Sequence, residues 1–197
     1  MRFGQNSLLN RYDLTTFVKI KITFMEQLKY PIGKYKKPLV IKTNHIENWI
    51  TIIENQPAKF RELVENLSEE DLNKTYRQGG WNIKEVVHHV VDSHINSFIR
   101  FKWTLTEDNP TIKAYYEDRW AMLDDYAQTP VEVSLKFMEA LHYRWVILLK
   151  SLTAEQRKRT FVHPDSGDTI PLDVLIGMYA WHGNHHIAHV ELALGKR

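Results

Sequence analysis

The chain has 197 residues, of which 43% are hydrophobic and 25% are charged, a balance typical of one globular domain rather than of a disordered or fibrous chain. Its formal net charge is +2 and no long basic run is flanked by aromatic residues, so we expect no nucleic-acid binding. The absence of cysteine excludes disulfides, thiolate ligands and a cysteine nucleophile, so any metal site must use nitrogen or oxygen ligands.

The N-terminal segment shows neither a membrane helix nor a signal peptide. No stretch reaches the roughly 18 consecutive apolar residues of a membrane span, and no small-residue cleavage site follows a compact apolar core. We therefore expect a cytoplasmic protein without membrane contacts. Residues 1–27 lack a sustained period and are expected to form a poorly ordered extension, with the folded domain spanning 28–197.

Hydrophobic periodicity predicts four long helices, at about 44–67, 83–105, 130–151 and 171–194. Asn82 is expected to cap the second helix, with Glu85 as its capping-box partner. Thr129 is expected to cap the third helix, with Pro130 in the first helical position. The positions of the third helix predicted to face inward are Val133, Phe137, Leu141, Trp145 and Leu148.

Two connections interrupt this pattern. Residues 106–128 form a long connection with a short helical turn expected around Glu117 to Leu123, and long connections of this kind often line a site. Residues 160–170 are expected to form a small hairpin or an irregular loop. Four long helices with one long crossover predict an all-α four-helix bundle.

Seven of the ten histidines fall in two short stretches, at 88–94 and 182–189. Residues four apart on a helix differ by only about 40° around its axis, so His182 and His186 project from one face. Together with a histidine of the second helix they would give three neutral imidazoles, a standard ligand set for a catalytic zinc-type site. Nickel, cobalt or iron would also accept such ligands.

The residues alone leave two choices open. His88 and His89 differ by about 100° around the helix, so only one of them can face the ion. His89 shares a stripe with Ser93, Asn96 and Arg100, whose polar side chains suit the wall of a water-filled pocket. His185 and His189 form a second pair with a spacing of four on a neighbouring stripe, and a site built on that pair is the alternative.

Four further residues near these stretches are candidates for orienting the ligand imidazoles or relaying protons: Asp92, His94, His185 and His189. A solvated helix face would explain each of them equally well. His45, His142 and His163 are scattered and receive no role.

Several motifs, taken together and in order, closely resemble the YfiT family of metal-dependent hydrolases, within the wider DinB-like superfamily. They are Tyr30-Pro31-Ile32-Gly33, residues 76–83, His88-His89 with Asp92-Ser93-His94, and Trp181-His182 with residues 185–189. The likeness covers about residues 28 to 192 and leaves only the N-terminal extension unmatched. Gly183 and Asn184, between two of the histidines, depart from the pattern without removing a candidate ligand.

The resemblance implies a DinB-like four-helix bundle that forms a homodimer and binds one divalent ion, nickel or zinc, per subunit. Its ligands would be His89, His182 and His186, which decides between His88 and His89. The superfamily also includes metal-dependent transferases that use bacillithiol, mycothiol or glutathione.

Three functional hypotheses follow. In a hydrolase, the ion would activate water for attack on a small-molecule substrate, with Asp92, His94, His185 or His189 shuttling protons. In a thiol S-transferase, the ion would hold a low-molecular-weight thiol that attacks an electrophile. In a non-catalytic metal-binding protein, the site would have no open position.

Overall fold

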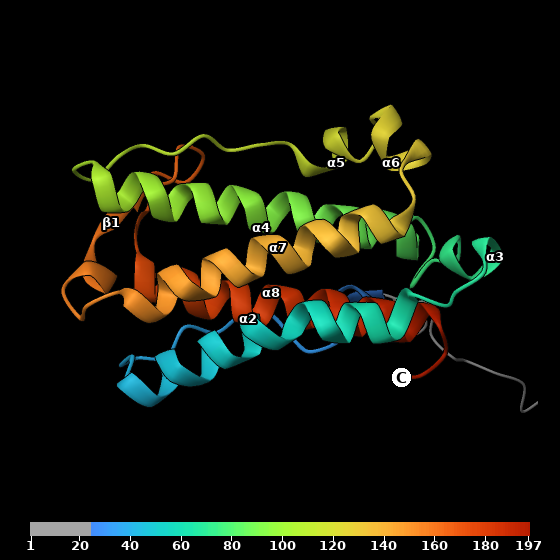
Figure 1. Cartoon of the computed structure of the whole chain (residues 1–197), viewed down its shortest axis with the longest axis horizontal. Coiled ribbons are helices and arrows are strands. Elements are labelled where there is room, and N and C mark those ends of the chain that lie inside the picture. The colour runs from blue at the N-terminus through green and yellow to red at the C-terminus, as the bar shows by residue number, and fades with distance from the viewer. Residues whose placement is uncertain (1–24) are drawn as a thin grey trace, which may run out of the picture.

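The computed structural model describes residues 25–197, in which four long helices lie side by side as a bundle (Figure 1). The long helices are α2 (Thr43–Val64), α4 (Ile83–Thr106), α7 (Val131–Ser151) and α8 (Leu172–Ala193). Each of α2 and α4 packs against both α7 and α8, so α2 and α4 face each other diagonally. The predicted all-α four-helix bundle is confirmed. Residues 25–29 are helical, but most of the expected extension lies outside the described residues, so the domain boundary at residue 27 stays a prediction.

The start of α4 follows its sequence signal. The Asn82 side chain accepts a hydrogen bond from the backbone N–H of Glu85 at 2.8 Å, and the Glu85 carboxylate accepts one from the N–H of Asn82 at 2.8 Å. This reciprocal pair satisfies two N–H groups that the helix itself leaves without partners. The capping box therefore fixes where the histidine-bearing part of α4 begins.

The predicted starts of α7 and α8 are wrong by one position. Thr129 ends the preceding short helix, and Pro130 is the N-cap of α7 with no side-chain bond. Pro171 pairs with Thr160 in a two-stranded ladder and is the N-cap of α8. In each case the proline lies one residue before the first helical residue. The backbone at that position is still extended, because it continues from the short element that precedes the helix.

The inward face of α7 also differs from its prediction. Leu141 and Trp145 are buried as expected, but Val133 and Phe137 are 53% and 46% exposed. The buried face is rotated and also carries Ser134, Leu135, Met138, His142, Val146 and Leu149. Apolar residues lie on both sides of this helix, so periodicity alone does not choose the face that meets α2 and α4.

The connection between α4 and α7 runs back along the outside of α4 (Figure 1). It contains the expected turn, α5 (Glu117–Trp120), and a second short helix that we did not predict, α6 (Asp124–Gln128). Tyr126 is 5% exposed and donates a 2.7 Å hydrogen bond to Asp92 on α4, which fastens the crossover to the bundle.

The remaining elements are short. They are α3 (Glu69–Leu72), the 3-10 helix η1 (Gln156–Lys158) and the strands β1 (Thr160–Val162) and β2 (Thr169–Pro171). The strands pair antiparallel, so of the two expected alternatives the hairpin, and not the irregular loop, precedes α8. The hairpin and η1 close the end of the bundle where α8 begins.

The core consists of two apolar clusters, one at each end of the bundle. One is built around Phe101, Trp145 and Leu175 and the other around Phe60, Val87 and Val190. On α8 the first cluster ends at Ala180 and the second begins at Ile187, so His182, His185 and His186 lie where the two clusters meet.

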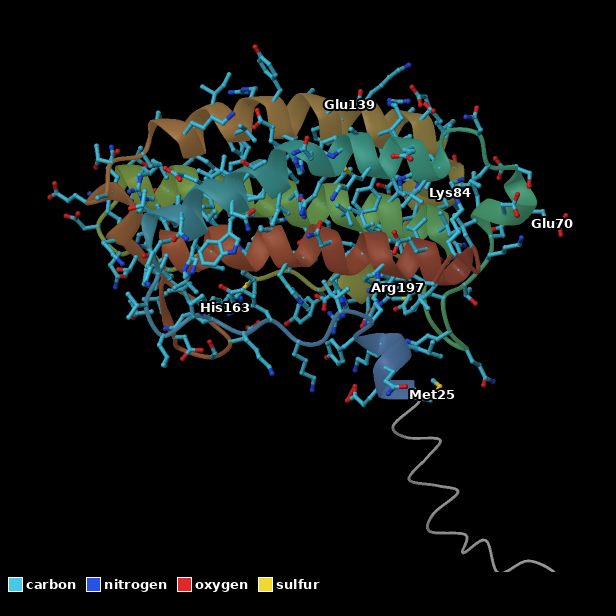
Figure 2. All side chains as sticks on the ribbon, turned by 90° about the horizontal axis from the view of Figure 1, so that it is seen from below. Met25, Glu70, Lys84, Glu139, His163 and Arg197 are labelled. Carbon is cyan, nitrogen blue, oxygen red and sulfur yellow. The ribbon has the colours of Figure 1, made fainter. Side chains whose placement is uncertain are left out.

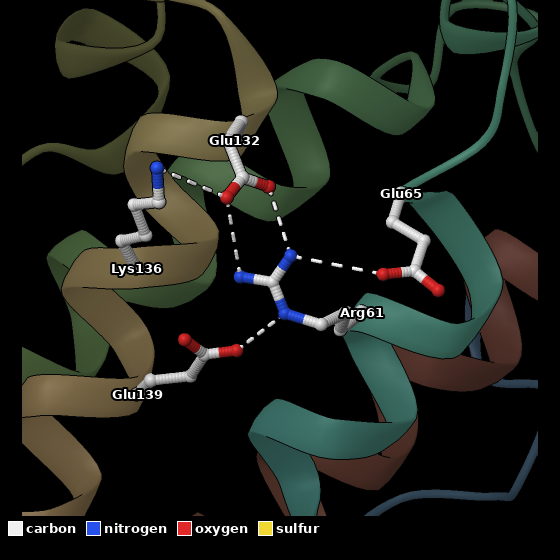
Figure 3. Close-up of polar contacts among 5 residues, drawn as sticks. All are labelled: Arg61, Glu65, Glu132, Lys136 and Glu139. Atoms are coloured by element: carbon white, nitrogen blue, oxygen red, sulfur yellow. Dashed lines mark hydrogen bonds and ion pairs between the residues drawn. The ribbon is translucent and has the colours of Figure 1, made fainter.

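A network of charges joins α2 to α7 on the surface (Figure 3). Arg61 lies 2.9 Å from the carboxylate of Glu132 and 2.5 Å from that of Glu139, and Glu65 and Lys136 extend the network. Exposed ion pairs contribute little stability, so we assign this network no large part in holding α7 against α2.

Candidate metal centre

Three histidines from two helices converge in the middle of the bundle. The ligand nitrogens of His89 on α4 and of His182 and His186 on α8 all lie within 4.8 Å of one another. Nitrogens bound tetrahedrally at about 2.0–2.1 Å stand about 3.3 Å apart, so small side-chain rotations would bring these three onto one ion. The structure thus brings together His182 and His186, the pair expected from their spacing, with His89, the candidate ligand implied by the family resemblance.

His89 and His88 have separate environments, although both are 5% exposed. The Nδ1 atom of His88 lies 2.7 Å from the hydroxyl of Ser134 on α7, so His88 faces away from the cluster. His89 makes no side-chain hydrogen bond within residues 25–197, and its Nδ1 is fully buried. A buried polar group without a partner is unfavourable, and a bound cation would supply the partner that His89 lacks.

Burial keeps the three imidazoles neutral. It lowers the pKa of His89 to about 4, and it lowers the pKa values of His182 and His186 well below 6.5. The neighbouring histidines add a smaller effect of the same sign, because they disfavour a second positive charge. A neutral imidazole has a free lone pair, which is the form that binds a metal ion.

A chain of histidines leads away from His182 into the core. The Nδ1 of His182 lies 3.1 Å from the Nε2 of His94, the Nδ1 of His94 lies 2.8 Å from the Nε2 of His142, and the Nδ1 of His142 lies 2.7 Å from the carbonyl oxygen of Ile53. Burial also lowers the pKa values of His94 and His142, so both rings are neutral. The chain spans three helices, α8, α4 and α7, and ends on α2.

The carbonyl at the end of this chain fixes every proton in it. The oxygen of Ile53 can only accept, so the Nδ1 of His142 donates and its Nε2 must accept from His94. His94 then accepts from the Nδ1–H of His182, which leaves the Nε2 of His182 without a proton. The core thereby selects the tautomer of His182 that presents Nε2 for metal binding.

A second, shorter chain does the same for His186. The Nδ1 of His186 lies 3.4 Å from the Nδ1 of His189, whose Nε2 lies 3.2 Å from the carbonyl oxygen of Lys29. That carbonyl accepts from His189, so His189 accepts from His186 and the Nε2 of His186 is free. Tyr76 stacks on His189 with ring centroids 3.8 Å apart and holds its plane.

The other two candidates have different surroundings. His185 lines the same pocket as the cluster, stacks on Trp181 and has no partner for its buried Nδ1. Asp92 accepts the hydrogen bond from Tyr126, and its carboxyl group does not line the pocket. Burial raises the pKa of Asp92, and the hydrogen bond from Tyr126 opposes that effect. Among the four predicted relay residues, Asp92 is therefore the one set apart from the cluster.

The cluster opens into a pocket of about 550 Å³. Besides the histidines, its walls carry Ser93, Arg100 and Tyr115 at one end and Tyr76, Arg77 and Trp81 at the other. Ser93 and Arg100, two of the polar residues expected on the same stripe of α4 as His89, line the pocket. Asn96, the third, does not line it, and its side chain donates to the backbone oxygen of Asp92. A pocket of this size can admit a small molecule to the three imidazoles.

The segment before α2 forms part of this site. The indole of Trp181 donates to the carbonyl of Gly33, and the hydroxyl of Tyr35 donates to the carbonyl of Val174, so the segment is tied along α8. Figure 2 shows it passing along α8 on the side where His163 lies. His163 is also part of the pocket wall. The segment thereby places the Lys29 carbonyl against His189.

Sequence reasoning missed His142 and the carbonyl groups that end the two chains. The only signal was a histidine beside Leu141 and three residues before Trp145, two positions of α7 that were predicted to face inward. Its partners are 48 and 89 residues away in the sequence, so no local pattern connects them.

No helix within residues 25–197 is long and apolar enough to span a membrane.

The amino-acid sequence matches one protein family and several relatives. A family model described as the DinB superfamily matches residues 52–190. A relative from Bacillus cereus (strain AH820), provisionally named a metal-dependent hydrolase, is 52% identical over 175 residues, which cover 88% of this chain and 98% of the relative. A relative from Bacillus anthracis (strain CDC 684 / NRRL 3495) with the same provisional name shows the same identity and coverage.

Solved structures agree with these matches. YfiT from Bacillus subtilis, provisionally described as a metal-dependent hydrolase with an unusual four-helix bundle topology, superposes with a TM-score of 0.83 at 44% identity, over 86% of this chain and 97% of YfiT. A mycothiol-dependent maleylpyruvate isomerase superposes with a TM-score of 0.60 at 13% identity, over 79% of this chain and 70% of the isomerase, a likeness of fold alone. On the family match and the identity to its relatives, the chain belongs to the DinB superfamily.

Proposed function

We propose that this protein is a metal-dependent hydrolase of small molecules, with His89, His182 and His186 as the ligands of one nickel or zinc ion. The observation that carries the proposal is the convergence of three neutral imidazoles at the wall of a pocket, with two of them set in the metal-binding tautomer by hydrogen-bond chains. The provisional names of the close relatives support the same activity.

Each group near the cluster has a distinct task in this proposal. A divalent ion bound there supplies Lewis acidity that lowers the pKa of coordinated water to about 7. His94 and His189 hold the two ligand rings in place through their hydrogen bonds. His185 lines the pocket beside the cluster, and this position is what makes it the candidate proton acceptor, because burial lowers its pKa to about 4 and so weakens it as a base. Asp92 takes no proton step, because it lies outside the pocket.

The test is metal analysis of protein purified without a polyhistidine tag, beside His89→Ala and His182→Ala variants. We expect about one ion per chain in the wild type and almost none in either variant. His88→Ala is the matched control, because His88 is the neighbour of His89, is equally buried and lies outside the cluster. Full metal content in His89→Ala, or equal losses in His88→Ala and His89→Ala, would contradict the ligand assignment.

The second candidate is a thiol S-transferase built on the same ion. The chain has no cysteine that would compete for the ion, and its fold is shared with a mycothiol-dependent enzyme. The two functions differ in one assay: only a transferase consumes an electrophile such as monochlorobimane in a thiol-dependent way. The non-catalytic alternative predicts turnover in neither assay. The homodimer implied by the family resemblance and the cytoplasmic location expected from the sequence stay predictions.

A further inference from the structure

Arg100 is a buried charge without a partner in the described part of the chain. It lies on α4, its side chain and backbone together are 9% exposed, and its Nε is fully buried with no hydrogen-bond acceptor. Within residues 25–197 its guanidinium forms no hydrogen bond, ion pair or cation–π contact, although Glu117 and Asp165 line the same pocket. An arginine side chain stays charged, and burying an unpaired charge is unfavourable.

The position of Arg100 relates it directly to the metal centre. Residues 89 and 100 are eleven apart, which places them within about 20° of each other around α4 and about 16 Å apart along its axis. Both line the pocket, and Ser93 lies on the same stripe between them. A molecule that reaches the three histidines from this side therefore passes Arg100.

The wall between the two sites offers further donors. The hydroxyls of Ser93 and Tyr179 lie 3.3 Å apart and both line the pocket, as does Tyr115. Burial raises the pKa of Tyr115 well above its usual value, so its phenol remains a donor. Three neutral ligands would also leave the charge of a bound ion uncompensated. The pocket thus favours molecules rich in negatively charged oxygen.

We propose that Arg100 binds an oxyanion group of the substrate, a carboxylate or a phosphate, while the reacting bond of the same molecule lies at the three-histidine cluster. The proposal deepens the proposed function by naming the substrate class, and it rests on that function for the role of the cluster. The planar fork of a guanidinium matches both oxyanions with two parallel hydrogen bonds. Arg100 is the most buried cation of the pocket, because Lys29 is exposed and Arg77 is partly exposed.

The test measures anion binding to the full chain after its metal has been removed with a chelator, so that no ion competes for the probe. The probes are phenyl phosphate and phenylacetate, with phenylacetamide as the uncharged counterpart, titrated by calorimetry. We expect the wild type to bind at least one anion tenfold or more tightly than the amide. Binding of only phenyl phosphate or only phenylacetate identifies which oxyanion the substrate carries.

Variants assign the binding to Arg100. Arg100→Met should abolish the preference for the anion, and Arg100→Lys should retain part of it, because lysine keeps the charge but not the fork. Arg144→Met is the matched control: it removes the same charge from an exposed position on α7 outside the pocket, and it should bind as the wild type does. A wild type without preference for anions, or an Arg100→Met variant that keeps the preference, would overturn the proposal.

Thermal unfolding separates a binding role from a structural one. If Arg100 serves a ligand, Arg100→Met should melt at or above the wild-type temperature, and phenyl phosphate or phenylacetate should raise the melting temperature of the wild type alone. A marked loss of stability in Arg100→Met, without any anion-dependent shift in the wild type, would make Arg100 structural. Because these measurements use metal-free protein, they fail or succeed independently of the metal analysis of His89→Ala.

Discussion

For single residues, the properties of the site depend on which ring nitrogen of each histidine carries the proton. The Ile53 carbonyl accepts from His142, and this one contact determines the tautomers of His142, His94 and His182 in turn. Such outer partners commonly contribute 10–100-fold to metal affinity. We therefore expect His142 to influence metal affinity, although it does not line the pocket.

We predict that His142→Leu lowers zinc affinity about 10-fold or more, because the His94 ring loses the acceptor that orients it. The variant should also lose about 1–3 kcal/mol of stability, since the buried carbonyl of Ile53 is left without a donor. Competition with a chromophoric chelator measures the affinity, and urea unfolding measures the stability.

His142→Gln is the conservative counterpart of that variant. Its amide can donate to Ile53 and accept from His94, so it should recover most of the zinc affinity. If the leucine and glutamine variants both bind zinc as the wild type does, the histidine chain does not position His182.

At the scale of elements, α8 approaches α2 closely at Gly183. The side chain of Gln56 on α2 is fully buried and donates to the carbonyl of Ala180 at 3.0 Å, and a Cβ at position 183 would overlap its amide group. Gly183 is one of the two residues for which the family resemblance implies a departure from the pattern. In the structure, its missing side chain leaves room for Gln56 between the positions of His182 and His186.

We predict that Gly183→Ala destabilises the protein by about 1–3 kcal/mol, because overpacking exceeds the gain of about 1 kcal/mol that alanine brings to a helix. Urea unfolding measures the change. In a Gln56→Ala background the same substitution should become neutral or stabilising, since the overlapping amide is gone. A stabilising Gly183→Ala in the wild-type background would refute this account of the contact.

The sequence predicted the positions of the long helices better than it predicted which side of each helix is buried. Hydrophobic periodicity and the Asn82–Glu85 capping box located the long helices within a few residues. Val133 and Phe137 were wrongly placed inside, because α7 is apolar on more than one side and packing against two neighbouring helices selects the buried face.

At the scale of the whole molecule, the histidines couple stability to pH. Burial lowers the pKa values of His88, His89, His142 and His185 to about 4 and of His189 to about 3. In the unfolded chain a histidine titrates near 6.5. As the pH falls below 6.5, the histidines of the unfolded chain bind protons while those of the folded protein stay neutral. The free energy of unfolding is therefore highest above about pH 6.5 and decreases toward pH 4.

We predict that the free energy of unfolding of the metal-free protein is nearly constant from pH 8 to 7 and falls steeply between pH 6.5 and 4. Each histidine contributes up to about 1.4 kcal/mol per pH unit. Urea titrations at several pH values measure the slope. Added zinc should extend the stable range toward lower pH, because the ion competes with protons for the ligands. An unfolding midpoint that does not change between pH 7 and 5 would show that the folded histidines titrate normally.

Hydrophobic periodicity predicted the helical bundle, the absence of cysteine excluded thiolate ligands, and the spacing along one helix predicted the pairing of His182 with His186. The family resemblance supplied His89. The tertiary structure was needed to find the groups that end the two histidine chains, which are His142 with the carbonyl of Ile53 and the carbonyl of Lys29. It was also needed to show that Arg100 has no partner within residues 25–197. The hydrogen-bonded partners among these groups lie on segments that are far apart in the chain. Whether the guanidinium of Arg100 has a partner depends on which residues pack beside it. Neither fact is encoded in the local sequence.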